Sequence, residues 1–377
     1  MEYRGDTPRH GIAAEEVPEL AAVLASPGPF ATVYLSTPAA VENAAQIAEQ
    51  PWRAARDELE RAGAPAAVAD AIGALVPGAH LEGRALAVVA DSSGVLLTRR
   101  EAEPIDRDVA RWAPLPSLGP VLEWQQSRIP HLVVLADRVG ADIALFLPDG
   151  ATGLSSVGGT DASDPLLHRS KPGGWSQRRF QERAENTWEA NAAQVADRVA
   201  TLAELTGARL VVVAGDVHAA RFLTEHLPDR LADLVVEIEG QRAAGVDFDA
   251  VADDVVKLVA TRVAEDTVEL LQKLREELGQ NDRAVEGVGS TLDALTAAQV
   301  DTLLVHDDPS DEREVWFATE GSSIAGDRAT LEGYGAASPA KGRLVDAMIR
   351  STLLTGARVR VVPSTVARDG VGALLRF

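Results

Sequence analysis

A short basic segment is the part of this chain best suited by composition to meet an anionic partner. It runs from His168 to Arg183, reads HRSKPGGWSQRRFQER, and carries five Arg or Lys residues against one Glu. The chain as a whole is acidic, with a formal net charge of −21. Two central glycines and a helical pattern behind them predict a mobile loop braced on a helix N-terminus, an arrangement that suits phosphate or RNA.

The side chains of this loop have distinct expected roles. Arg178 and Arg179 are expected to hold phosphate, and Trp175 to stack on a base. Cations in the first turn of a helix oppose its dipole, so their repetition as far as Arg183 indicates selection for an anionic partner. The alternative is an ordinary solvated loop. The remaining candidate RNA or ribosome contacts are His168, Arg169, Lys171, Gly173, Gly174, Ser176 and Gln177.

Composition restricts the class of protein. A chain of 377 residues suggests two or three domains. It has no cysteine, no apolar run of membrane-spanning length and no apolar signal core, so we expect a cytoplasmic protein without disulfides. A pI of about 4.7 argues against general DNA or RNA binding. The segment Lys341–Phe377 is also basic, and we expect it to face RNA or a translational GTPase.

Hydrophobic patterning predicts an α/β fold with three domains. The first, 1–126, has a strand at 31–37, a helix at 41–62 and a hairpin at 85–98.

The central domain, 127–282, shows three short strands (132–136, 143–147 and 151–156), a helix at 177–205, a strand at 209–214 and a helix at 247–278. That order is typical of a ribonuclease-H-like domain.

The third domain, 283–377, alternates helices and strands and is predicted to form a small α/β/α sandwich. Its expected elements include a helix over 341–354. The Gly- and Ser-containing stretch 320–338 is expected to be a flexible loop.

A metal-dependent nuclease is an alternative reading of the central domain. Asp216 and His218 follow a buried strand and could bind a metal together with Asp137. Two-metal chemistry needs several converging carboxylates, which the sequence does not supply, so no metal and no cofactor are predicted. Phosphate-loop, serine-hydrolase and zinc-protease motifs are absent. The run His306–Asp308 is expected to form a turn with capping side chains.

Two segments resemble a known superfamily. The run VGSTLDALTAAQVDTLLV, 288–305, resembles the opening of the C-terminal domain of archaeo-eukaryotic release factors and Pelota. The run DGVGALLRF, 369–377, resembles its closing strand. The three-domain order resembles that of the bacterial members, which include the ribosome hibernation factor Balon and its actinobacterial relatives. The resemblance implies a Pelota-like layout with a central ribonuclease-H-like domain.

The resemblance also implies a ribosomal function with two open versions. In release factors a Gly-Gly-Gln loop enters the peptidyl transferase centre; here Trp175 and Ser176 stand between Gly174 and Gln177. The first version is a factor that occupies the A site of idle or stalled 70S ribosomes during stress, with peptidyl-tRNA and elongation factor Tu as candidate partners. The second is a rescue enzyme in which Gln177 helps to hydrolyse peptidyl-tRNA or cleave tRNA. An acidic adaptor for protein partners is the remaining alternative.

Overall fold

The computed structural model describes residues 11–37, 44–77, 84–101, 105, 107–137, 140–157, 168–170, 188–238, 248–280, 283–362 and 367–377. The chain forms two compact units. The first unit combines Met1–Gln126 with Thr267–Phe377, and the second comprises Ser127–Asp266. Compactness does not show which segments fold independently, so the predicted boundaries at 126 and 282 stay predictions.

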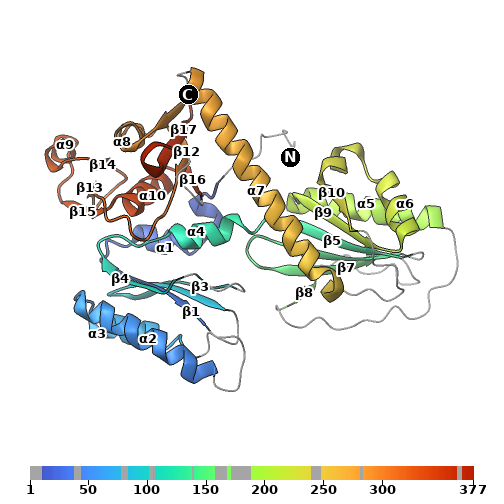
Figure 1. Ribbon diagram of the computed structural model, residues 1–377, viewed down its shortest axis with the longest axis horizontal. Helices are drawn as coiled ribbons and strands as arrows, with labels where there is room; N and C mark the ends of the chain where they lie inside the picture. Colours follow the sequence, from blue (N-terminus) through green and yellow to red (C-terminus); the bar gives the residue numbers. More distant parts are fainter. Residues whose placement is uncertain are drawn as a thin grey trace. The chain divides into compact units, whose positions relative to one another are not determined.

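The N-terminal part of the first unit is an antiparallel sheet with the strand order β3-β2-β1-β4 (Figure 1). Its strands are β1 (Phe30–Ser36), β2 (Ala85–Asp91), β3 (Gly94–Glu101) and β4 (Val109–Ala113). Helices α2 (Ala44–Arg61) and α3 (Ala66–Gly73) cover one face. Leu59, Ile72 and Val88 meet there in one apolar core. Every residue of β2 is buried, because both faces of the sheet are packed.

The C-terminal part of the first unit holds two small sheets, ordered β11-β17-β12-β16 and β14-β13-β15. The strands are β11 (Ala284–Glu286), β12 (Val300–Val305), β13 (Glu314–Ala318), β14 (Ile324–Ala325), β15 (Pro339–Arg343), β16 (Arg358–Val361) and β17 (Val371–Leu375). The helices are α8 (Val288–Thr296), α9 (Arg328–Gly333) and α10 (Leu344–Leu354). All but the last residue of α10 are buried, so this helix is the centre of the lobe.

One apolar core joins the N-terminal and C-terminal parts of the first unit. It combines Val17 and Leu20 near α1 (Leu20–Ala25), Leu122 from α4 (Gly119–Gln126), and Met348 from α10.

N-terminal residues also cover an edge of the C-terminal sheet. Ile12 forms an isolated antiparallel bridge with Val359 of β16. The Gln126 side chain donates to Val361 O at 2.7 Å and accepts from Val361 N at 3.0 Å. Strand β16 is therefore an edge whose backbone groups are satisfied by the N-terminal segment.

The second unit is built on a six-stranded mixed sheet with the order β10-β9-β5-β6-β7-β8. Strands β5 (His131–Ala136), β6 (Ala141–Phe146), β7 (Thr152–Val157) and β8 (His168–Ser170) are antiparallel neighbours. Strands β9 (Leu210–Gly215) and β10 (Val235–Glu237) run parallel to β5 on its other side. This is the ribonuclease-H-like order that the sequence predicts.

Helices pack on both faces of this sheet. Helices α5 (Trp188–Thr206) and α6 (Val217–His226) share a core with Leu132, Ile143 and Val213. The opposite face meets Val251 and Val255 of α7 (Phe248–Gln280). Further along the same helix, Leu270 and Leu274 belong to the core of the first unit, with Leu304 and Leu374. Among the described helices, none is long and apolar enough to cross a membrane.

The predicted α/β class is confirmed, as are the strands that the sequence indicated in all three regions. Two predictions in the C-terminal part are wrong. The helix predicted from Lys341 begins at Leu344, because Lys341 and its neighbours pair with β13 as strand β15. The stretch 320–338, predicted as a flexible loop, contains β14 and α9, whose Leu331 is fully buried. Tertiary packing orders this Gly- and Ser-containing segment.

We predict that Gly215→Ala destabilises the second unit by about 2 to 4 kcal/mol. Gly215 has a φ of 119°, and a Cβ there would lie 2.1 Å from the Ala136 carbonyl oxygen of the neighbouring strand. The measurement is urea denaturation followed by circular dichroism. Gly279→Ala is the control, because nothing lies within 4 Å of a Cβ at that helical position. The control should be neutral or stabilising by up to about 1 kcal/mol; equal losses in both variants would contradict the prediction.

Candidate functional site

The structure describes only the start of the predicted basic loop. His168 and Arg169 belong to β8, where they pair with Leu154 and Gly153 of β7. The other candidates lie outside the described residues: Lys171, Gly173, Gly174, Trp175, Ser176, Gln177, Arg178, Arg179 and Arg183. Their proposed contacts with RNA stay predictions.

The elements on either side of the loop, β8 and α5, both belong to the second unit. Strand β8 is held by β7, and α5 buries Val195, Val199 and Leu202 against the sheet. The Arg198 Nε donates to Ser155 Oγ of β7 at 3.1 Å, which joins the helix and the sheet. The basic segment is therefore attached at both ends to one packed framework.

The carboxylates considered for metal binding have local structural partners. Asp216 caps the N-terminus of α6, accepting from the backbone N–H groups of His218 at 3.0 Å and Ala219 at 3.2 Å. Asp137 accepts from Gly140 N at 2.9 Å. Across the described ranges, no group of three or more His, Asp or Glu residues is placed to hold a metal ion. Asp216 serves as a helix cap, the role that an Asp before a helix commonly takes.

The basic C-terminal segment uses its cations within the protein. Arg350 is only 9% exposed and donates to the carbonyls of Ala318, Thr319 and Gly321 at 2.8 to 3.2 Å. Burial lowers the pKa of Arg350. Five other cations also have internal partners: Lys341 with Glu314, Arg343 with Asp307 and Asp346, Arg358 with Glu16, Arg360 with Thr267, and Arg376 with Thr355 O. These contacts give several of the cations structural roles, while Lys341 and its partner Glu314 are 51% and 54% exposed. The expectation that this segment faces RNA or a translational GTPase stays a prediction.

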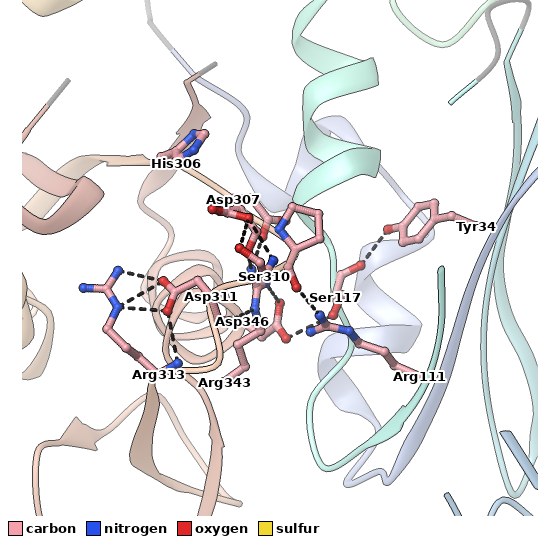
Figure 2. A network of polar contacts seen from close by, with 12 residues as sticks. Tyr34, Arg111, Ser117, His306, Asp307, Ser310, Asp311, Arg313, Arg343 and Asp346 are labelled. Atoms are coloured by element: carbon pink, nitrogen blue, oxygen red, sulfur yellow. Dashed lines mark hydrogen bonds and ion pairs between the residues drawn. The ribbon is translucent and has the colours of Figure 1, made fainter. Parts of the chain in front are cut away.

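A buried polar network joins the N-terminal and C-terminal parts of the first unit (Figure 2). Arg343, the last residue of β15, lies at its centre. Its Nη2 is 2.6 Å from Asp307 Oδ1, and its Nη1 is 3.2 Å from Asp346 Oδ1. The guanidinium also donates to the backbone carbonyls of Asp311 at 2.9 Å and Asp308 at 2.5 Å. Burial disfavours the charge, but Asp346 and Asp307 outweigh it and raise the pKa of Arg343.

The N-terminal part supplies hydrogen bonds to the same network. Ser117 Oγ donates to Asp346 Oδ2 at 3.0 Å, and Tyr34 Oη donates to Ser117 O at 2.6 Å. Arg111 of β4 donates to Pro309 O at 2.7 Å. The Asp307 carboxylate lies so close to Gly119, the first residue of α4, that a Cβ there would be 1.8 Å from Oδ2. Segments about two hundred residues apart in the chain are thus joined by polar contacts.

Asp346 has the most perturbed environment in this network. Its side chain is 2% exposed, and burial raises its pKa to about 7 although Arg343 favours the charged form. Asp307 adds repulsion, whereas the Ser117 hydrogen bond favours the carboxylate. Burial and the two carboxylates likewise raise the pKa of Tyr34. This raised pKa means that the folded environment disfavours the ionised form of Asp346, relative to water, by on the order of 4 kcal/mol.

Only part of this network could be predicted from the sequence. The run His306–Asp308 was expected to form a turn with caps, and Asp308 does so by accepting from Ser310 N at 2.8 Å and Ser310 Oγ at 2.7 Å. These bonds lower the pKa of Asp308. Asp307, the neighbouring residue, instead turns into the network. Nothing in the local pattern distinguishes these two residues, because their partners come from distant segments.

The second unit is thus a ribonuclease-H-like α/β fold that carries a basic insertion between an edge strand and a helix. Residues 130–280 match the model of bacterial archaeo-eukaryotic release factor family 2. This match confirms the resemblance to that family predicted from the sequence.

Whole-chain comparisons give more distant relatives. The uncharacterized protein Rv2629 of Mycobacterium tuberculosis is 27% identical over 363 residues, covering 94% of this chain and 95% of that protein. Ribosome-bound archaeal Pelota, described together with ABCE1, aligns with 100% of this chain at 16% identity, covering 99% of that chain, with a TM-score of 0.37. Archaeoglobus fulgidus Pelota aligns with 78% of this chain and 79% of that chain at 15% identity, with a TM-score of 0.36.

We predict that Arg343→Met lowers the free energy of unfolding by about 3 to 5 kcal/mol, because it leaves two buried carboxylates without their shared cation. Chemical denaturation at neutral pH measures the loss. Arg61→Met is the control, since the Arg61–Glu58 pair has exposed fractions of 66% and 50% and should contribute at most about 1 kcal/mol. A loss for Arg343→Met no larger than that of the control would show that the network contributes little.

Proposed function

We propose that this protein is a translation factor that binds the 70S ribosome. The observation that carries the proposal is the match of residues 130–280 to a bacterial release factor family. One distant structural relative is described as ribosome-bound archaeal Pelota, which is consistent with the proposed ribosome binding. The composition of the basic segment adds a physical argument, because it concentrates cations in an acidic protein where the central fold can present them to RNA.

In its more specific form, the proposal is that the factor occupies the A site of idle or stalled ribosomes and protects them by occupancy during stress. The basic segment 168–183 would approach the peptidyl transferase centre and contact ribosomal RNA. Peptidyl-tRNA and elongation factor Tu are the proposed neighbouring partners. Occupancy needs no small cofactor, and the basic segment 341–377 is a second proposed contact, with RNA or a translational GTPase.

The second candidate function is ribosome rescue by hydrolysis of peptidyl-tRNA or cleavage of tRNA. The observation that favours it is Gln177, close behind Gly173 and Gly174 in a family whose release factors act through a Gly-Gly-Gln loop. Trp175 and Ser176 separate Gln177 from the two glycines, so its side-chain amide lies further along the chain than in a Gly-Gly-Gln loop. A displacement of about 1 Å in a catalytic group can cost roughly 10²-fold in rate, so occupancy is the preferred function.

Replacing Arg178 and Arg179 together with Ala should weaken ribosome binding and reduce its salt dependence. If each cation contacts one phosphate, the slope of log affinity against log salt should fall by about 1 to 2. Co-sedimentation with 70S ribosomes at several salt concentrations measures both quantities. The matched control is Arg221→Ala with Lys257→Ala, two cations of the same unit whose side chains are each 74% exposed. Equal weakening of ribosome binding by both double variants would contradict a specific role of the loop.

Gln177→Ala should leave binding and ribosome protection nearly unchanged if the protein acts by occupancy. The assay incubates protein with empty and peptidyl-tRNA-loaded ribosomes and measures bound protein, released peptide and cut tRNA in the same samples. Binding without either product supports occupancy. A product that appears with the parent protein and disappears with Gln177→Ala would instead identify a rescue enzyme, and absence of binding would contradict both functions.

A further inference from the structure

We propose that Asp346, Arg343, Asp307 and Ser117 form a proton-dependent latch that fastens the N-terminal part of the first unit to its C-terminal lobe. This inference is independent of ribosome binding. It concerns how tightly α4 and the preceding segment are held against α10. The four residues are called the Asp346 latch below.

The geometry places two carboxylates on one guanidinium in a site closed to water. Side chains of Asp307, Asp346 and Arg343 are 9%, 2% and 10% exposed. When both acids are ionised, Arg343 is the one cation among the described residues that forms an ion pair with them, so the buried group carries excess negative charge. A proton on Asp346 removes that excess. The protonated acid can still hydrogen-bond, whereas desolvation of a second anion is costly.

Other groups near Asp346 do not change this balance. Arg111 on β4 favours the carboxylate but ranks behind Arg343 and Ser117 in its effect. Tyr34 on β1 adds a neutral hydroxyl. His306, on the loop that carries Asp307, contacts Val362 O through its Nδ1 at 3.0 Å, and its charge acts on Asp308. The titration that matters for the latch is therefore that of Asp346.

The latch joins two chain segments, so the protonation state of Asp346 affects how tightly these segments are held together. Ser117 precedes α4, and Asp346 lies in the first turn of α10. Gly119, at the start of α4, touches Asp307. Ionisation of Asp346 thus destabilises the junction at which α4 packs on the C-terminal lobe. Opening of this junction would return both carboxylates to water.

The direction of the pH effect follows from the raised pKa of Asp346, about 7 in the folded protein against 3.8 for the free side chain. The folded protein holds the proton more tightly than the opened one, so the latch weakens as pH rises from about 4 through about 7. Between pH 6 and pH 8 the opening equilibrium should change by about tenfold through this group alone.

Hydrogen exchange of the α4 backbone amides, corrected for intrinsic rates, tests the latch. Between pH 6 and pH 8 their protection should fall about tenfold further in the parent protein than in Asp346→Asn. Asp293→Asn, which removes an exposed carboxylate, and His306→Gln should both retain the parent pH dependence. A parent and an Asp346→Asn protein with the same pH dependence would overturn the proposal.

Carbon-13 NMR of the carboxyl groups gives a second readout that does not depend on junction opening. Asp346 should titrate near pH 7, and Ser117→Ala should move its midpoint upward, because the lost hydrogen bond favoured the carboxylate. A midpoint below about 5, or one that Ser117→Ala does not move, would contradict the assignment. If Asp346→Asn fails to fold, the shift caused by Ser117→Ala identifies the resonance and still decides the question.

Discussion

The first unit depends on keeping Arg343 and two carboxylates buried together. That requirement draws the loop after β12, the end of β15 and the start of α10 to one point, and Ser117 brings the N-terminal part to the same place. Around it, residues from both ends of the chain fill a single apolar core. The apolar core supplies most of the attraction, while the polar network fixes which segments meet and in which register.

The second unit is organised around a sheet and not around a buried ion network. Its sheet is packed on both faces, and it carries a basic segment between β8 and α5 whose flanks are part of the packed framework. An interaction surface on a rigid scaffold can vary in sequence without loss of the fold. Most of the family match, residues 130–266 of 130–280, lies in this unit, which is why the proposed ribosomal function is centred there.

The C-terminal segment shows that cations clustered in the sequence can have structural roles within the protein. Arg350, Arg358 and Arg360 appear in sequence as a basic run close to the end of the chain. In the structure Arg350 donates to backbone carbonyls at the end of β13 and in the loop that follows it. Arg358 donates to the Gly11 carbonyl and the Glu16 carboxylate, and Arg360 donates to the Thr267 hydroxyl. A guanidinium has several donors in a fixed plane, so it is well suited to satisfy buried acceptors from separate segments.

The sequence alone was enough to predict the α/β class and the elements with strong local patterns. Buried strands such as β5 and β9 are short apolar runs, and the spacing of apolar residues along α7 is that of a helix packed on one side. It also located the basic segment 168–183, because charge contrast is a property of composition. The folded structure was needed to show that Asp307 and Asp346 share Arg343, that 320–338 contains ordered elements, and that Ile12 and Gln126 cover β16. These outcomes depend on contacts between residues far apart in the chain, and local pattern carries no record of such contacts.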